Sequence, residues 1–316
     1  MQNLNNADYK LYKSVIMARE KPLLKTVISF LKKKYDEVIE RDTFVMAVGT
    51  IPIALVAHLD TVFENPPSNV YYDREQGVIW SPEGGCGDDR AGVFVILKLV
   101  IQGFRPTVIF TLGEEIGGLG ASKLVAEYQK PLTELKYIIE LDRRGSTDCV
   151  FYDCNNEEFV DFVESYGFIE NFGSFSDISI ICPVWGIAGV NLSIGYENEH
   201  SFSEIVRTKP MLKTTSKVAQ MLKDANEASA YKYIPSPYPN GLFMNYLMDK
   251  MTGVEQCAVC GNYFNEYELI PVEEHDDIHY YCPDCCSDSN KVGWCAKCGS
   301  AFKKENPQEK FCYLCR

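Results

Sequence analysis

The sequence has 316 residues, of which 46% are hydrophobic and 24% are charged, and its formal net charge is −13. This length and apolar fraction fit a globular protein with one large or two medium domains. The negative charge argues against nucleic-acid binding, because attraction to phosphates needs a basic surface. No apolar stretch reaches the roughly 18 to 20 residues of a membrane span, and the N-terminal residues lack the apolar core of a signal peptide. We therefore expect a cytoplasmic protein that contacts neither nucleic acid nor membrane.

Residues 1–230 show alternating helical and strand patterns and are predicted to form one domain. Apolar residues at helical spacing predict a helix at 11–40. Short apolar runs then predict strands at 44–48, 51–57, 78–80, 107–111, 137–141, 150–152, 178–181 and 190–194. Helical patterns between some of these runs predict helices at 91–101, 121–129, 157–166 and 210–225. The predicted fold class is α/β, with a mostly parallel mixed sheet flanked by helices.

Acidic and histidine side chains lie where four of the predicted strands end, and in the glycine-rich loop 84–92. In an α/β sheet, sites form where loops leave the carboxyl ends of the strands. Imidazole and carboxylate groups together are ligands for Zn²⁺ or a similar divalent ion. The residues in these positions are His58, Asp60, Asp88, Glu114, Glu115, Asp142 and His200.

This set holds more carboxylates than a single metal ion needs. One carboxylate can bridge two ions about 3.5 Å apart, which gives a two-metal hydrolytic site. The adjacent Glu114 and Glu115 can divide the work, because one can bind metal while the other holds the attacking water as general base. The pattern therefore favours a metal-dependent hydrolase.

The segments around these residues resemble the co-catalytic zinc exopeptidases, a superfamily that includes bacterial leucyl aminopeptidase, tripeptidase, glutamate-releasing carboxypeptidases, aminoacylases and glutaminyl cyclases. The resemblance covers residues 48–221 and rests on five segments in the same order. These are His58-x-Asp60, Gly-Asp88-Asp-Arg-Ala-Gly, Gly-Glu114-Glu115, Glu-Leu-Asp142 and Glu-Asn-Glu-His200-Ser.

The resemblance implies two co-catalytic zinc ions and a role for each residue. Glu114 would be the general base and acid, and Asp60 would accept the second ring N–H of His58, which fixes its tautomer. The implied ligands are His58 and Asp142 for one zinc ion, Glu115 and His200 for the other, and Asp88 as the bridge between them.

Several residues near these motifs have two interpretations each. Asp177 follows a segment that resembles a loop shaping the substrate pocket, and it could contact a substrate amine or have a structural role. Tyr196 could steady the oxyanion of the reaction. Arg143 and Arg144 could bind a substrate carboxylate, but we favour the interpretation that they offset the dense negative charge. No spare histidine is available to activate Cys86 as a nucleophile, so packing in a tight loop is the preferred interpretation.

Spacing distinguishes the branches of the family. Only 29 residues separate His58 from Asp88, and only 57 separate Asp142 from His200. The carboxypeptidase and aminoacylase branches usually carry an inserted domain at the second place, so the resemblance implies a compact aminopeptidase-like enzyme. It would remove the N-terminal amino acid from a peptide or amino-acid amide. Two alternatives stay open: a dizinc amidohydrolase or deacylase acting on a non-peptide or modified substrate, and a non-catalytic interaction module.

Nine of the 13 cysteines lie after residue 256, and eight of them form four C-x-x-C pairs. Two such pairs supply the four thiolate ligands of a tetrahedral Zn²⁺ site. We therefore predict a linker at 231–256 and a small domain of tandem zinc ribbons at 257–316, with two structural zinc ions. The sequential pairing assigns one ion to Cys257, Cys260, Cys282 and Cys285, and the other to Cys295, Cys298, Cys312 and Cys315.

Other arrangements of this region stay open. An interleaved pairing of RING type would regroup the cysteine pairs, and His275 or His279 could replace a ligand, whereas Cys286 has no pair. A disulfide framework is disfavoured because nothing indicates secretion. Residues 257–316 contain ten acidic and six basic residues. We therefore expect protein contact, self-association, a lid or a stabilising role for this region rather than nucleic-acid binding.

Overall fold

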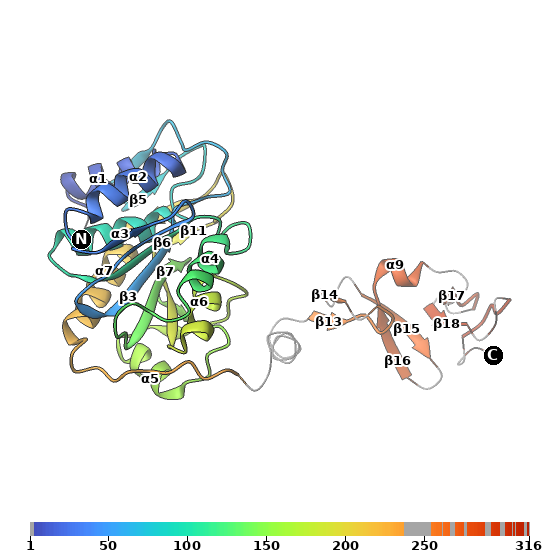
Figure 1. The fold of residues 1–316 in the computed structure, drawn as a ribbon. Coiled ribbons are helices and arrows are strands. Elements are labelled where there is room, and N and C mark those ends of the chain that lie inside the picture. Colours follow the sequence, from blue (N-terminus) through green and yellow to red (C-terminus); the bar gives the residue numbers. More distant parts are fainter. Residues whose placement is uncertain are drawn as a thin grey trace. The chain divides into compact units, whose positions relative to one another are not determined.

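The chain forms two compact units, Met1–Ser236 and Pro237–Arg316, which are described separately (Figure 1). The computed structural model describes residues 3–236, 254–260, 262–265, 269–274, 277–287, 292–297, 301–304, 306, 308–312 and 315. Among these residues, no helix combines the length and the apolar character that a membrane crossing requires.

The first unit is built on an eight-stranded mixed sheet with the strand order β1-β2-β6-β3-β7-β10-β8-β9. The pairs β6–β3, β3–β7 and β7–β10 at its centre are parallel, as is the edge pair β8–β9, while the other three pairs are antiparallel. This confirms the predicted mostly parallel mixed sheet. The strands are β1 (Val38–Glu40), β2 (Phe44–Ala47), β3 (Ile51–His58), β6 (Pro106–Thr111), β7 (Tyr137–Arg143), β8 (Asp148–Val150), β9 (Ile169–Glu170) and β10 (Gly189–Ser193).

Helices cover both faces of this sheet (Figure 1). Successive side chains of a strand point to opposite faces, so Leu55 and Val56 of β3 lie in two different core clusters. Residues of α1, α2, α3, α5 and α7 pack into the cluster of Leu55, and residues of α4 and α6 pack into that of Val56. The helices are α1 (Asn6–Ile16), α2 (Glu20–Leu31), α3 (Arg90–Ile101), α4 (Leu119–Glu127), α5 (Glu157–Ser165), α6 (Asp177–Trp185) and α7 (Thr208–Asp224).

The N-terminal region differs from the single helix predicted at 11–40. It contains α1, α2 and the edge strand β1. Arg19 is extended as the N-cap of α2, and Pro22 lies in the first turn of that helix. A proline is tolerated there, because its missing N–H needs no partner, but inside one long helix it would break the hydrogen-bond ladder.

The run 178–181, predicted as a strand, lies in helix α6, so this prediction was wrong. Ser176 and Ser179 form a capping box at the start of the helix, and Gly186 ends it in the left-handed conformation with φ 68°. A short apolar run of β-branched residues carries no periodicity that separates a buried strand from a buried helical turn. As a consequence, Asp177 lies in the first turn of a helix and not in a loop.

A second, four-stranded sheet of the first unit has the order β11-β12-β5-β4 and is antiparallel. Only β5 (Val78–Trp80) was predicted from the sequence. The other strands are too short to show an alternating pattern; they are β4 (Tyr71–Asp73), β11 (Tyr196–Glu197) and β12 (Ile205–Arg207).

The described part of the second unit consists of short strands and one short helix. β13 (Val254–Gln256) pairs with β14 (Tyr263–Asn265), and a four-stranded sheet has the order β16-β15-β18-β17. The remaining elements are β15 (Ile270–Glu274), β16 (Asp277–Tyr281), α9 (Pro283–Cys286), β17 (Val292–Trp294) and β18 (Ala301–Lys303). This small, cysteine-rich unit is consistent with a zinc-ribbon domain.

The predicted linker at 231–256 is divided between the two units. Lys232 and Pro235 form isolated β-bridges with Ile187 and Cys154, so the first residues of that segment pack on the first unit. Its last residues form β13 of the second unit. Residues 237–253 lie outside the described part of the chain.

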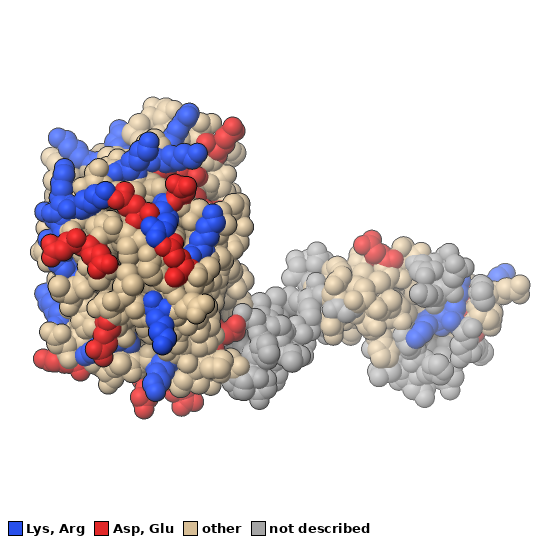
Figure 2. All heavy atoms as spheres, in the orientation of Figure 1, with Lys and Arg blue, Asp and Glu red and all other residues tan. Residues whose placement is uncertain are grey.

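Charge is distributed unevenly over the first unit. Figure 2 shows many of the Lys and Arg side chains gathered over helices α1 and α2. A group of acidic side chains, which includes Asp60, Asp88, Glu114, Glu115 and Asp142, lies at the carboxyl ends of the central strands and in the loop before α3.

Candidate metal centre

The carboxyl ends of the central parallel strands bring the predicted site residues together. His58 is the last residue of β3 and pairs in register with Thr111, the last residue of β6. Glu114 and Glu115 follow β6, and Asp142 lies near the end of β7. Parallel strands end at the same edge of a sheet, so these side chains share one location.

Two groups of potential metal ligands meet at Asp88. The Nε2 atom of His58 lies 3.1 Å from Oδ1 of Asp88 and 3.5 Å from Oδ1 of Asp142. The Nε2 atom of His200 lies 3.1 Å from Oδ2 of Asp88 and 3.1 Å from Oε2 of Glu115. Within each group of three residues, the ligand atoms lie within 4.8 Å of one another. Each oxygen of Asp88 therefore faces a different histidine, which is the arrangement that a bridging carboxylate needs.

The two groups differ in their exposure to solvent. The side chain of His58 is 1% exposed at the end of a central strand, whereas that of His200 is 50% exposed. His200 lies in the loop between β11 and β12 and has a left-handed backbone with φ 60°. One half of the centre is thus enclosed by the sheet, and the other half opens to solvent.

The side chains around the first group fix its orientation. The Nδ1 atom of His58 lies 3.4 Å from Oδ1 of Asp60. The second oxygen of Asp60 accepts the backbone N–H of Glu115 at 3.2 Å. Asp60 thereby links a residue of each group, and a carboxylate behind a histidine orients the ring for metal binding.

Asp142 is held by three side chains from other elements. Its carboxylate accepts the hydroxyl of Ser176 at 3.2 Å and the hydroxyl of Tyr196 at 3.1 Å. Its backbone N–H donates to the side-chain oxygen of Asn191 at 2.9 Å. Tyr196, considered above for the oxyanion, is only 3% exposed, and its hydroxyl is directed at a candidate ligand.

Asp177 is fully buried and takes part in the packing below the site. Its carboxylate accepts the hydroxyl of Thr111, and its exposed fraction is 0%. Burial raises the pKa of Asp177 to about 6, although the hydrogen bond from Thr111 opposes this change. This geometry favours the structural role over contact with a substrate amine.

Glu204 is a residue that sequence reasoning missed. It is 1% exposed and accepts three consecutive backbone N–H groups, those of Cys86 at 2.6 Å and of Gly87 and Asp88 at 3.0 Å. Burial raises its pKa to about 7, although the N–H groups oppose this change. Glu204 follows His200 by four residues, so one carboxylate ties the loop of His200 to the loop of Asp88. The one signal in the sequence was that an acidic residue, Glu204, lies shortly after His200, the last candidate ligand.

We expect Glu204→Gln to weaken metal binding at the candidate centre by about 10- to 100-fold. The amide N–H₂ group of glutamine is a donor, so at least one backbone N–H that Glu204 accepts in the original protein would lose its acceptor. Competition with a chromophoric chelator measures the metal affinities. Glu199→Gln, in the same loop and paired with Arg144 at 2.7 Å, is the matched control. Unchanged affinities in a folded Glu204→Gln protein would contradict a positioning role.

The helix that follows Asp88 is anchored by a second aspartate. The side chain of Asp89 accepts the N–H groups of Gly92 at 2.9 Å and of His58 at 3.2 Å, so it caps α3 and contacts β3. A side chain at position 92 would not fit, because a Cβ atom would lie 2.0 Å from the carbonyl oxygen of Leu141. The Asp-x-x-Ala-Gly segment therefore seats the helix directly against the central strands.

The remaining candidates have structural partners. Arg144 pairs with Glu199 at 2.7 Å, which fits the charge-offsetting interpretation. Arg143 instead donates to the neutral carbonyl oxygen of Phe172 at 2.8 Å. Cys86 is buried, and burial raises the pKa of its thiol to about 12. A thiol with this pKa is a poor nucleophile, which agrees with the preferred interpretation that Cys86 packs in a tight loop.

Crowding of carboxylates shifts the acid–base properties of the metal-free centre. Burial, and next the charge of Asp142, raises the pKa of Glu114 to about 9. Burial, and next the charge of Asp88, raises the pKa of Glu115 to about 7. Hydrogen bonding to Asp88 raises the pKa of His200 to about 9. These groups would hold protons at neutral pH, and bound cations would replace those protons.

We expect the metal-free protein to lose stability as the pH rises from about 5 to about 9. In this range the folded state holds protons on Glu114 and Glu115, and above about pH 6.5 also on His200, that the unfolded chain has already released. Unfolding therefore becomes easier as the pH increases. Calorimetry in the presence of a chelator should show the melting temperature falling by about 5 °C or more. Zinc should remove this fall, and Glu115→Gln should reduce it below pH 7. A melting temperature that rises over this range would contradict the explanation.

The cysteines of the second unit form two clusters. The sulfur atoms of Cys257, Cys260, Cys282 and Cys285 all lie within 4.8 Å of one another, as do those of Cys295, Cys312 and Cys315. Cys298, the predicted fourth ligand of the second cluster, lies outside the described residues, as does His275. These groups correspond to the sequential pairing and not to an interleaved one. Four thiolates in one cluster are the donor set of a structural zinc site.

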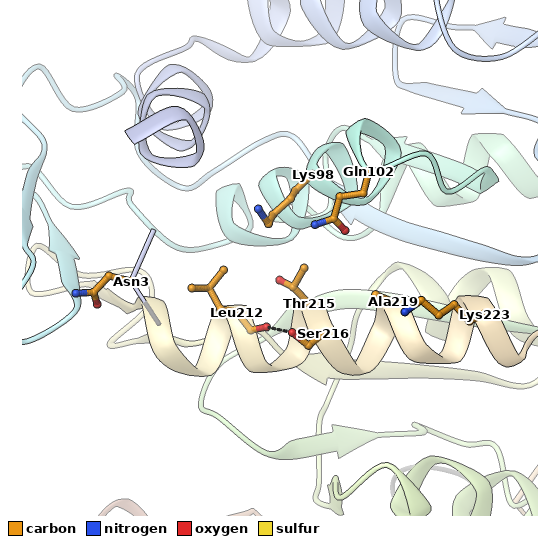
Figure 3. Close-up of a pocket in the computed structure, with 8 residues that line it drawn as sticks. All are labelled: Asn3, Lys98, Gln102, Leu212, Thr215, Ser216, Ala219 and Lys223. Carbon is orange, nitrogen blue, oxygen red and sulfur yellow. Dashed lines mark hydrogen bonds between the residues drawn. The ribbon is translucent and has the colours of Figure 1, made fainter. Parts of the chain in front are cut away.

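A separate hollow of about 360 Å³ lies between α3 and α7 (Figure 3). Lys98 and Gln102 line it from the last turns of α3, whereas Asp89 caps the first turn of the same helix beside the metal centre. A helix rises about 1.5 Å per residue, so Lys98 and Gln102 lie roughly 13 to 20 Å along α3 from its start beside the candidate ligands. The hollow is a different place from the candidate metal centre.

Comparison with solved structures identifies the fold of the first unit. A tripeptidase from Staphylococcus aureus matches with a TM-score of 0.59 and 15% sequence identity, over 72% of this chain and 100% of that chain. The aminopeptidase PepT from Bacillus cereus matches with a TM-score of 0.55 and 15% identity, over 69% of this chain and 98% of that chain. The first unit therefore shares its fold with these two peptidases.

A third match is the TET1 peptidase of Pyrococcus horikoshii, which can assemble into a tetrahedron or a large octahedral shell. Its TM-score is 0.52 and its identity 14%, over 68% of this chain and 99% of that chain. No family model matches the sequence. No curated protein matches it either. At these identities, the likeness establishes the fold alone.

Proposed function

We propose that the chain is a metal-dependent aminopeptidase that hydrolyses the first peptide bond of its substrate. The observation that carries this proposal is the position of Asp88, whose two oxygens each lie 3.1 Å from a different histidine. With Asp142 on one side and Glu115 on the other, the donors form two sets of nitrogen and oxygen ligands around a shared carboxylate. Nitrogen and oxygen ligands of this kind suit Zn²⁺.

The metal-free arrangement itself supports the fit of two cations. Several carboxylates of the centre are buried close together, and in the described part of the chain the Oε1 atom of Glu115 has no hydrogen-bond partner. Burial, and next the charge of Asp88, raises the pKa of Asp142 to about 6, as expected where a positive charge is needed. His58 and Asp142 would hold one ion, Glu115 and His200 the other, and Asp88 both.

When bound, the two ions supply Lewis acidity to the scissile carbonyl and activate water as a nucleophile. Glu114 would take the proton of the attacking water and pass it to the leaving amine. Its high pKa in the metal-free centre favours holding a proton, and nearby cations would lower that pKa toward the working pH. Asp60 would keep the Nδ1–H tautomer of His58, which leaves Nε2 free as a ligand.

The reaction type is supported by the fold relatives, which are an aminopeptidase, a tripeptidase and a TET1 peptidase. The test is a panel of unblocked tripeptides, aminoacyl anilides and N-acyl amino acids, assayed with and without chelator. We expect hydrolysis of substrates with a free N-terminus and its loss with chelator. Cleavage of acylated substrates alone would indicate a deacylase. Cleavage of neither class would favour an interaction module.

We further propose that the second unit holds two structural zinc ions on its cysteine clusters. Elemental analysis of the zinc-loaded protein should then find four zinc ions per chain, and mild chelation should remove the carboxylate-held pair first. By analogy with the TET1 peptidase, we also propose that copies of this chain associate, which sedimentation velocity tests. A count of two ions with intact activity would contradict one of the two metal assignments.

A further inference from the structure

Two groups of apolar side chains, five of the six exposed, border the open half of the candidate metal centre. We call them the first wall (Val62, Phe63 and Phe202) and the second wall (Ile116, Leu119 and Phe175). Phe202 is 74% exposed and Ile116 is 78% exposed. Exposed apolar side chains that gather in one place usually mark a binding surface.

The first wall is attached to ligand-bearing segments. Val62 follows Asp60 by two residues, and Phe202 follows His200 by two. The rings of Phe63 and Phe202 lie 6.0 Å apart between centroids, so the two segments meet. Phe63 rests on the loop that leads to Asp88, where a Cβ atom at Gly84 would lie 2.5 Å from its ring. Glycine is therefore required there for the aromatic pair to reach the edge of the site.

The second wall continues from two other segments of the candidate centre. Ile116 directly follows Glu115, and Phe175 directly precedes Ser176, the hydroxyl donor to Asp142. Phe175 packs on Gly118, where a Cβ atom would lie 2.8 Å from its ring. Leu119 likewise packs on Gly113, where a Cβ atom would lie 2.9 Å from its side chain.

The two walls leave from the same metal position. Glu115 and His200 approach within 3.1 Å of each other, and the chain continues from one to Ile116 and from the other to Phe202. A peptide bound with its scissile carbonyl at this position would have its neighbouring side chains within reach of the segments that carry the walls. An apolar side chain gains free energy from this contact, whereas a charged side chain loses hydration.

We propose that the two walls select peptides with bulky apolar side chains next to the cleaved bond. This inference rests on the proposed exopeptidase function and adds the class of substrate. The occupant is the substrate itself, because the walls continue directly from the residues that would hold the reacting bond.

The test uses the full-length, zinc-loaded protein and tripeptides that differ only in the first residue, which is Phe, Leu, Gly, Lys or Glu. We expect kcat/KM for Phe and Leu to exceed that for Gly, Lys and Glu by at least about tenfold. Phe202→Ala on the first wall and Ile116→Ala on the second should each reduce the Phe-to-Gly ratio by about threefold or more. Ile169→Ala, on the edge strand β9 and 63% exposed, is the control and should leave the ratio unchanged.

Binding of amino-acid hydroxamates separates this inference from the activity. If no peptide is cleaved, the proposed function fails, and calorimetry with phenylalanine and glycine hydroxamates decides about the walls. A phenylalanine hydroxamate bound at least about tenfold more tightly supports them, and equal affinities overturn them. If peptides are cleaved, a flat or charge-preferring profile overturns the inference. So does a wall variant that changes the sedimentation coefficient but not the selectivity, since the walls would then join copies of the chain.

Discussion

Glu114→Gln is expected to lower kcat by about 10³-fold while both metal ions of the first unit stay bound. A general base contributes on the order of 10² to 10⁴ to a proton-transfer reaction, and glutamine keeps the size of the side chain but cannot accept the proton. Glu114 belongs to neither group of candidate ligands, so its replacement should leave both sets of donors intact. Steady-state kinetics on the best tripeptide and zinc analysis of the same preparation measure the two effects.

The exposed Glu134→Gln is the matched control, because it makes the same chemical change outside the centre. Its activity and zinc content should equal those of the original protein. If Glu114→Gln loses zinc, the residue is a ligand and the assignment of the adjacent glutamates must be exchanged. If it keeps full activity, another group moves the proton.

The pattern of strand ends, together with the glycine-rich loop, was enough to predict which residues gather at the candidate metal centre. The reason is physical: parallel strands must end at one edge of a sheet, so acids and histidines at those ends converge whatever the exact element bounds. His58 and Asp142 lie on neighbouring strands for this reason. The wrong prediction of a strand at 178–181 did not affect this result, because α6 supplies the N-cap residue Ser176, which donates to Asp142, and no candidate ligand.

The residues that hold the ligands in place were not predictable in the same way. Glu204 accepts a hydrogen bond from the backbone N–H of Cys86, which lies 118 residues earlier in the sequence. Nothing in the local sequence of either segment requires that contact. Asn191 and Ser176 reach Asp142 from β10 and from the N-cap of α6. Such contacts follow from how loops close over the sheet, and loop closure leaves no periodic signal in the sequence.

Asp88→Asn is expected to reduce the zinc content of the protein from four ions per chain to three or fewer, and activity by at least about 100-fold. Each oxygen of Asp88 lies 3.1 Å from the Nε2 atom of a different histidine, so a single side chain would serve both ions. Asparagine has one oxygen and one amide nitrogen that carries hydrogens, so it can supply a ligand to one ion only. It also removes the negative charge that would lie between two divalent cations.

Variants on either side of the bridge show whether the loss is specific to it. Asp142→Asn should lower the affinity for the ion beside His58, and His200→Ala should lower the affinity for the ion beside Glu115. Each variant leaves the donors of the other ion in place. Calorimetric titration of the chelator-treated protein with Zn²⁺ resolves these cases. Asp88 is an ordinary ligand of one ion if two results are found together. Asp88→Asn would lower the affinity for one ion no more than Asp142→Asn or His200→Ala does, and it would leave the affinity for the second ion unchanged. The two-ion mechanism would then lack its shared carboxylate, and one ion with Glu114 would have to carry the hydrolysis.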